Sequence, residues 1–204
     1  VLIYPYNAYA LDVKEIGSFH IGGASVSISV SDQELKSINL VNSTGAAYNP
    51  NGTYESGQMY VQYVTLTNPK AKFPLMLWHG GGLCGSTYET TPDGRRGWQM
   101  FFLQAGHDVY ISDAVERGRA GFSLYPYIFK TQPQMRSKEE MWTLFRIGPS
   151  YKGPSGKPVA FEGTQFPLEY FDQFAKQGVP RWTDTDELAY KAYLKYLDVM
   201  QQPS

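Results

Sequence analysis

Alternating apolar and polar residues in the first third of the chain predict β-strands. Residues 17–21 and 26–30 alternate on either side of a Gly-Gly-Ala-Ser segment at 22–25. We therefore expect these two runs to pair as a hairpin around a glycine turn. Residues 58–66 alternate in the same way and predict a third strand.

The pattern changes to a continuous apolar run at residues 74–78. Such a run is typical of a strand that is buried on both faces, as in a parallel sheet. Apolar residues then recur at helical spacing over 98–105, and Gly106 is expected to end this helix. Residues 109–113 form the next buried run. Strand, helix and strand in this order predict a βαβ unit and hence an α/β fold.

From about residue 124 the sequence becomes irregular, aromatic and interrupted by prolines. A capping box at 137–140 predicts the start of one helix, and Pro167 predicts the start of a second. A third helix is expected over 186–200, where one stripe of residues is apolar. Helices inserted after a βαβ unit suggest a lid over a site.

Composition narrows the classes of function. The 204 residues carry 18 Lys and Arg against 19 Asp and Glu, a formal net charge of −1. This balance argues against binding to nucleic acid and against a polybasic membrane surface. The sequence has no apolar run of the length that crosses a membrane. Its single cysteine cannot form an internal disulfide framework or a cysteine-rich metal site, so we expect no metal and no other cofactor.

The sharpest chemical signal is the glycine loop, residues 79–82 (His79-Gly80-Gly81-Gly82), directly after the first buried run. Glycines let backbone N–H groups turn toward a ligand without obstruction by a Cβ atom. In α/β-hydrolases, the loop after the third strand supplies one half of the oxyanion hole. A tight turn without chemistry is the alternative interpretation.

Further motifs make the chain resemble one small group of α/β-hydrolase esterases, the exported bacterial carboxylesterases and their fungal relatives. The motifs are His79 to Gly85, Glu89-Thr90-Thr91-Pro92-Asp93-Gly94-Arg95, Asp113 with Arg117-Gly118-Arg119, Phe145-Arg146-x-Gly148-Pro149, Thr164-Gln165-Phe166-Pro167 and Val179-Pro180-x-Trp182. The resemblance covers about residues 16–182. It implies the amino-terminal part of an α/β-hydrolase sheet with a helical lid insertion. Residues 1–123 would form the sheet with its oxyanion loop, and residues 124–204 the lid that leads to the nucleophile strand.

The resemblance also implies roles for individual residues. The N–H group of Gly81 would hold the oxyanion, and Gly82 is a possible second contributor. His79 and Gly80 would lie beside the substrate. One bacterial member of the group has two adjacent cysteines where Gly81 and Gly82 stand, so its vicinal disulfide cannot form here. The oxyanion role of a backbone N–H group does not depend on this change.

A catalytic triad is missing from this sequence. Serine hydrolases of this fold need G-x-S-x-G or a close variant after the fifth strand, then an acid and a histidine. The chain contains no G-x-S-x-G, and its three histidines (His20, His79 and His107) all lie in the first strands or the glycine loop. We therefore expect a carboxy-terminal partner chain of the same precursor, which would carry the triad. This partner would also cover an otherwise unpaired sheet edge.

Cys84 has three possible roles. A disulfide to the partner chain, a buried free thiol and a catalytic nucleophile all fit an unpaired cysteine in this position. The nucleophile interpretation is the weakest, because no histidine is evidently placed to activate the thiol.

Two sequons point to secretion. Asn42 and Asn51 begin N-x-Ser/Thr sites in a loop rich in glycine, asparagine and proline, where a glycan would be tolerated. The first residue is Val1 rather than methionine, which indicates processing or trimming. A secreted glycoprotein is therefore expected.

The leading hypothesis from the sequence is a secreted serine carboxylesterase that acts on a small-molecule ester with its partner segment. Trp142, Phe145 and Trp182 of the lid are candidates to wall the substrate pocket. The rival hypotheses are a non-catalytic binding module with a hydrolase fold and a Cys84-dependent hydrolase. A homo-oligomer remains possible, and the substrate class is open among esters, amides, lactones and polyesters.

Overall fold

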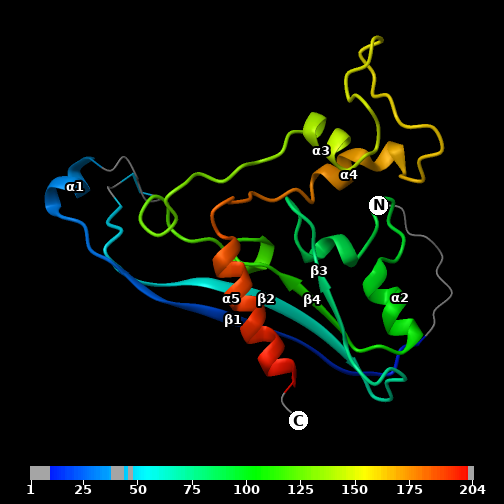
Figure 1. The fold of residues 1–204 in the computed structure, drawn as a ribbon, viewed down its shortest axis with the longest axis horizontal. Coiled ribbons are helices and arrows are strands. Elements are labelled where there is room, and N and C mark those ends of the chain that lie inside the picture. Colours follow the sequence, from blue (N-terminus) through cyan, green and yellow to red (C-terminus); the bar gives the residue numbers. More distant parts are fainter. Residues whose placement is uncertain (1–9, 38–43, 46–47, 202–204) are drawn as a thin grey trace.

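A computed structural model describes residues 10–37, 44–45 and 48–201 (Figure 1). Its centre is a four-stranded mixed sheet in the order β1-β2-β4-β3. β1 pairs with β2, and β2 with β4, in antiparallel fashion, whereas β3 and β4 are parallel. The strands are β1 (Val13–Ile28), β2 (Gly52–Leu66), β3 (Leu75–Trp78) and β4 (Val109–Asp113). The helices are α1 (Asp32–Ser37), η1 (Gly85–Tyr88), α2 (Trp98–Ala105), η2 (Gly118–Ala120), α3 (Lys138–Leu144), η3 (Leu168–Tyr170), α4 (Phe171–Ala175) and α5 (Asp186–Gln201).

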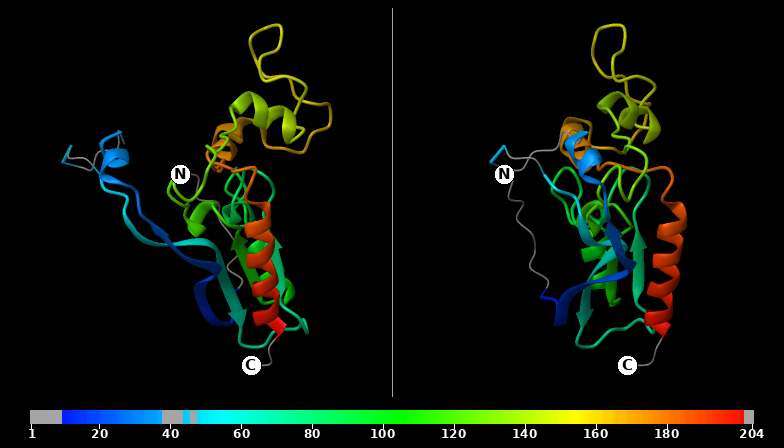
Figure 2. Two further views of the ribbon diagram at one scale, coloured as in Figure 1. Left: turned by 60° about the vertical axis from the view of Figure 1, so that its left-hand side comes forward. Right: turned by 90° about the vertical axis from the view of Figure 1, so that its left-hand side faces the viewer.

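The predicted hairpin within residues 17–30 is wrong. These residues belong to one long strand, β1, which stays paired with β2 from Val13 to Ile28. Gly22 and Gly23 take positive φ angles of 78° and 73°, but the chain does not reverse there. Instead, a Cβ atom at Gly22 would lie 2.8 Å from the Cβ atom of Ala192. The glycine is thus required for the close approach of α5, and beyond it the two strands extend away from the rest of the molecule (Figure 2).

The predicted βαβ unit is confirmed as β3, α2 and β4. The helix begins at Trp98 and ends at Ala105, and Gly106 follows it in the left-handed conformation with a φ of 95°. β3 and β4 pair in parallel from Leu75 opposite Val109 to Trp78 opposite Ser112. This unit places the ends of two neighbouring strands at the same edge of the sheet.

The core has one hydrophobic layer on each face of the sheet. Met59 and Val61 of β2 pack on the α5 side, whereas Val64 and Leu66 of the same strand pack in the layer that contains Leu103 of α2. Successive side chains of a strand point to opposite faces of the sheet, so the odd-numbered and the even-numbered residues of β2 lie in different layers. Helices therefore cover both faces, as expected for an α/β fold.

The second half of the chain divides into two parts. α3 and α4 pack together above the sheet, and the predicted capping box is confirmed, because Ser137 and Glu140 exchange hydrogen bonds with each other's backbone. α5 also lies in the region predicted as a lid, residues 124–204, but it packs against β1 and β2. Ala192 and Tyr196 of α5 belong to the sheet core. The last helix is thus part of the core, and a lid role remains a prediction for the residues before it.

Candidate active site

The glycine loop follows β3 at the carboxyl end of the strand, next to the end of β4. Gly82 has a φ of 76°, a conformation that favours glycine over a residue with a side chain. Among the described residues, no acceptor receives the N–H group of Gly81. This N–H group is therefore available to a ligand.

The second half of the loop is attached to the α3–α4 cluster, defined by the buried residues Leu83, Met141, Trp142, Ile147, Phe171 and Phe174. Leu83, the residue directly after the glycine loop, is a member of this cluster. The N–H group of Val179 donates to the carbonyl oxygen of Gly82 at 3.0 Å. The loop is thus held from above by apolar packing and a hydrogen bond.

His79 holds the loop against β4. Its Nε2 atom accepts a hydrogen bond from the N–H group of Ala114 at 3.0 Å, and Nδ1 lies 2.9 Å from the carbonyl oxygen of Gly80. The ring is buried, and burial lowers the pKa of His79 below its usual value. A neutral ring that accepts at Nε2 must carry its proton at Nδ1. His79 therefore acts as a structural link in this chain.

An NMR titration tests this assignment of His79. We expect the imidazole resonances to titrate with a midpoint below about 6.5, the ordinary value for histidine. Protonation of Nε2 would break the bond to Ala114, which is why the folded state resists it. A midpoint at or above that value would show that the ring is not buried in its neutral form.

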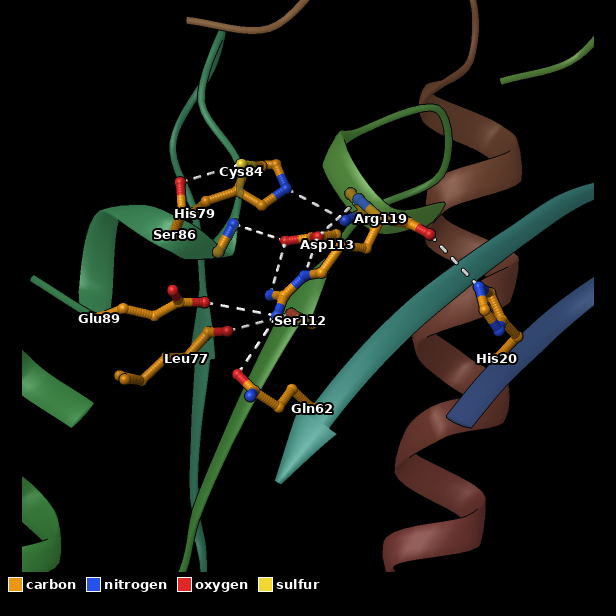
Figure 3. A network of polar contacts seen from close by, with 12 residues as sticks. His20, Gln62, Leu77, His79, Cys84, Ser86, Glu89, Ser112, Asp113 and Arg119 are labelled. Carbon is orange, nitrogen blue, oxygen red and sulfur yellow. Dashed lines mark hydrogen bonds and ion pairs between the residues drawn. The ribbon is translucent and has the colours of Figure 1, made fainter. Parts of the chain in front are cut away.

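Asp113 braces the loop from the other side (Figure 3). Its carboxylate is fully buried and accepts hydrogen bonds from the N–H group of Gly85 at 2.5 Å and from the N–H group of Arg119 at 2.8 Å. The Nε atom of Arg119 forms an ion pair with it at 2.8 Å. Arg119 reaches Glu89 as well, at 3.4 Å. Burial opposes the charge, but the bonds from Arg119 and Gly85 outweigh it and lower the pKa of Asp113.

Glu116 is a buried carboxylate that the sequence did not single out. It accepts hydrogen bonds from the N–H group of Trp182 at 3.3 Å and from the hydroxyl of Thr185 at 3.0 Å. Arg117 pairs with it at 3.1 Å. Burial raises the pKa of Glu116, although Arg117 opposes the shift. Glu116 also has a φ of 65°, which is uncommon for a residue with a side chain and is a signal that only the structure provides.

A pocket of about 200 Å³ opens beside the glycine loop. Its lining includes Gly80, Gly81, Glu116 and Arg181, so the loop, the end of β4 and the residues before α5 all contribute. Larger cavities lie elsewhere, including one of about 540 Å³ between the glycines of β1 and α5. The smaller pocket brings the N–H group of Gly81 together with the charged side chains of Glu116 and Arg181.

The three aromatic residues proposed to wall the substrate pocket are not at this pocket. Trp142 is buried in the α3–α4 cluster, and Phe145 packs on Phe174 with ring centroids 5.0 Å apart. Trp182 is buried against Phe129, and its indole N–H donates to a carbonyl oxygen. These rings pack in hydrophobic clusters, a use that sequence alone does not separate from pocket lining, and a substrate-binding role for them stays a prediction.

Cys84 is a free thiol of intermediate burial. Its Sγ atom lies 3.2 Å from the hydroxyl oxygen of Ser86. In the part of the chain that the structure describes, no histidine is hydrogen-bonded to this sulfur. The geometry therefore gives no support to a catalytic thiol.

Of the two sequons, Asn42 lies outside the described residues. Asn51 is exposed, and its side-chain amide bonds to the backbone of Val30, accepting at 2.7 Å and donating at 3.1 Å. Glycosylation at either position remains a prediction.

Within residues 10–37, 44–45 and 48–201 there is no cluster of three or more His, Cys, Asp or Glu side chains that could hold a metal ion. No helix of the described part of the chain has the length and apolar character needed to cross a membrane.

A curated protein is similar to part of this sequence, and a solved structure is similar to its fold. No family model matches the chain. It is 42% identical over 77 residues to a fungal protein described as "Probable secreted lipase phiG" from Fungal sp. (strain ATCC 74256), in an alignment covering 38% of this chain and 21% of that protein. The fold matches the structure of a bacterial esterase with a TM-score of 0.73 and 30% sequence identity, over 97% of this chain and 61% of the esterase. The chain thus spans less than two thirds of these proteins; it is a relative of this esterase and this lipase, with an α/β-hydrolase-like fold.

Proposed function

We propose that the chain is the oxyanion-loop and lid portion of a carboxylic-ester hydrolase. A serine from a second segment would attack the ester carbonyl, with a histidine and an acid from that segment as base and orienting group. The N–H group of Gly81, together with the N–H group that follows the serine, would hold the oxyanion of the tetrahedral intermediate.

One observation carries this proposal: the N–H group of Gly81 has no acceptor among the described residues, at the carboxyl end of a parallel strand. Ligands of open α/β sheets bind at this end of the strands. The match of the fold to a bacterial esterase over 97% of this chain supports a hydrolase role for the loop.

The second segment would dock along β3. In the described residues β3 pairs with β4 alone, so its other edge offers free hydrogen-bonding groups. Trp98 and Phe101 of α2 are 59% and 62% exposed, and Phe73 just before β3 is 69% exposed. Large apolar residues exposed together indicate a contact surface. A carboxy-terminal segment that adds a strand beside β3 would cover both features.

Secretion is part of the same proposal. The fungal relative carries the word "secreted" in its description, and Asn51 of the exposed sequon is accessible at the surface. An extracellular, glycosylated enzyme agrees with both observations.

Turnover of simple aryl esters tests the proposal. The complete protein, expressed from its entire coding sequence, is expected to hydrolyse 4-nitrophenyl butyrate and to lose this activity after treatment with a fluorophosphonate. A folded protein that neither hydrolyses esters nor reacts with the probe would instead be a binding module. Activity that survives the probe but disappears in Cys84→Ala would assign the chemistry to the thiol.

A further inference from the structure

Arg181 stands at the x of the Val179-Pro180-x-Trp182 motif, and hydrogen bonds fix the backbone on both sides of its side chain. Its N–H group donates to Gln134 at 2.9 Å, and its carbonyl oxygen accepts from the N–H group of Gln134 at 2.7 Å. The next N–H group, that of Trp182, donates to Glu116 at 3.3 Å. The start of the Arg181 side chain is therefore held in place next to the pocket.

The guanidinium group of Arg181 lies against the glycine loop. A Cβ atom built on Gly81 would be 3.2 Å from Nη1 of Arg181, and both residues line the pocket of about 200 Å³. The side chain is one third exposed, so it is accessible from the pocket and yet partly shielded from water. A ligand held by the Gly81 N–H group would thus be within reach of this cation.

The hydrogen-bonding capacity of Arg181 is largely unused. Its Nε atom is buried and has no hydrogen-bond partner within the described part of the chain. Its ion pair with Asp186 is long, at 3.9 Å, and the Asp186 side chain is 83% exposed. A guanidinium group has five N–H donors in a planar fork, so several remain for a ligand.

Besides Arg181 and Asp186, the pocket is lined by two charged residues, Glu116 and Arg117, and both are already engaged. Glu116 and Arg117 pair with each other at 3.1 Å, and Glu116 also accepts from Trp182 and Thr185. Arg117 donates further to the carbonyl oxygen of Leu83 at 3.3 Å. Arg181 is therefore the charged lining residue with the most donors left for a bound group.

We propose that Arg181 binds an anionic group of the substrate, so that this protein prefers esters that carry a carboxylate a few atoms from the scissile carbonyl. The inference rests on the proposed ester hydrolysis and adds its substrate class. A guanidinium fork matches the two oxygens of a carboxylate, and such charge-assisted bonds are stronger than neutral ones. Arg181 acts here as a specificity residue; the bond that breaks is the same ester bond.

Two esters of equal chain length test the preference in the complete protein. 4-Nitrophenyl hemiglutarate and 4-nitrophenyl pentanoate differ in the end of the acyl chain, a carboxylate in one and a methyl group in the other. Arg181→Gln is expected to lower kcat/KM for the hemiglutarate by about 10- to 100-fold and to leave the pentanoate within about threefold. Arg146→Gln, at an exposed arginine of the α3–α4 region, is the matched control and is expected to leave the ratio unchanged.

Equal losses for both esters, an unchanged ratio in Arg181→Gln, or the same change in the control would overturn the role of Arg181.

Binding gives a readout that does not depend on hydrolysis. Calorimetry with the glutaric acid monoanilide should show tighter binding than with the pentanoic anilide, and Arg181→Gln should remove the difference. Equal binding of the two anilides by the unmodified protein would refute the inference even where esters are hydrolysed. Absence of hydrolysis with a charge-dependent difference in binding would refute the proposed function alone.

Discussion

Replacing Gly81 with proline is expected to lower kcat for ester hydrolysis by about 10²–10³, the usual cost of removing one oxyanion donor. Proline has no N–H group, so the substitution deletes the donor that the structure leaves without an acceptor. KM should change much less than kcat, because the oxyanion forms only after the nucleophile has attacked. Steady-state kinetics of the complete protein measure both constants.

Gly81→Ala is the matched variant for this experiment. Alanine keeps the N–H group, and its Cβ atom would meet only the end of the flexible Arg181 side chain, at 3.2 Å. We expect this variant to retain most of the turnover on a neutral ester. Thermal melting controls for folding in both variants. If a folded Gly81→Pro protein turned over substrate at the original rate, Gly81 would not be an oxyanion donor.

Asp113→Asn is expected to lower the free energy of unfolding by about 3–5 kcal/mol, the usual effect of removing one partner of a buried ion pair. The carboxylate is fully buried and holds the N–H group of Gly85 together with the backbone and side chain of Arg119. An amide has one acceptor oxygen and an NH₂ group that would face other donors. Urea unfolding monitored by tryptophan fluorescence measures the difference.

Asp172→Asn is the control for this substitution. Asp172 also forms an ion pair, with Lys138 at 2.7 Å, but its side chain is 68% exposed. Exposed pairs contribute about 0–1 kcal/mol, so this variant should unfold nearly as the original protein does. Equal effects of the two substitutions would contradict a special role for the buried carboxylate.

The same carboxylate predicts part of the acid sensitivity of the fold. The pKa of Asp113 is lowered in the folded state, so its stabilisation is complete above the ordinary aspartate value of about 3.9. The stabilisation is lost as the pH falls from there through the folded-state pKa. Asp113→Asn should therefore show a weaker loss of stability below about pH 4 than the original protein. An identical acid limb in the two proteins would contradict the lowered pKa.

The predictions that the structure confirms rest on local signals in the sequence. The capping box at Ser137 and the glycine after α2 specify helix ends by contacts within a few residues. β3 pairs with β4, which is the next strand along the chain, and α2 connects the two. Such features can be read from the chain because no distant contact decides them.

The remaining features depend on distant contacts. Gly22 and Gly23 look like a turn in the sequence, yet Gly22 is packed against Ala192 of α5, far along the chain, and Gly23 against the backbone of β2. No sequence motif specifies Glu116 or Arg181, and only the fold brings them together with the glycine loop at one pocket. Aromatic residues such as Trp142 and Trp182 suit both a substrate pocket and a hydrophobic core. Only tertiary packing separates these uses.

Locating the residue that a fluorophosphonate modifies in the complete protein tests directly whether the nucleophilic serine lies in another segment. Peptide mass mapping after labelling identifies that residue. We expect one modified serine outside residues 1–204, in the segment that would add a strand beside β3. A label on a residue of 1–204, or a folded and active protein without any label, would contradict the claim that this chain supplies the oxyanion loop to a serine in another segment.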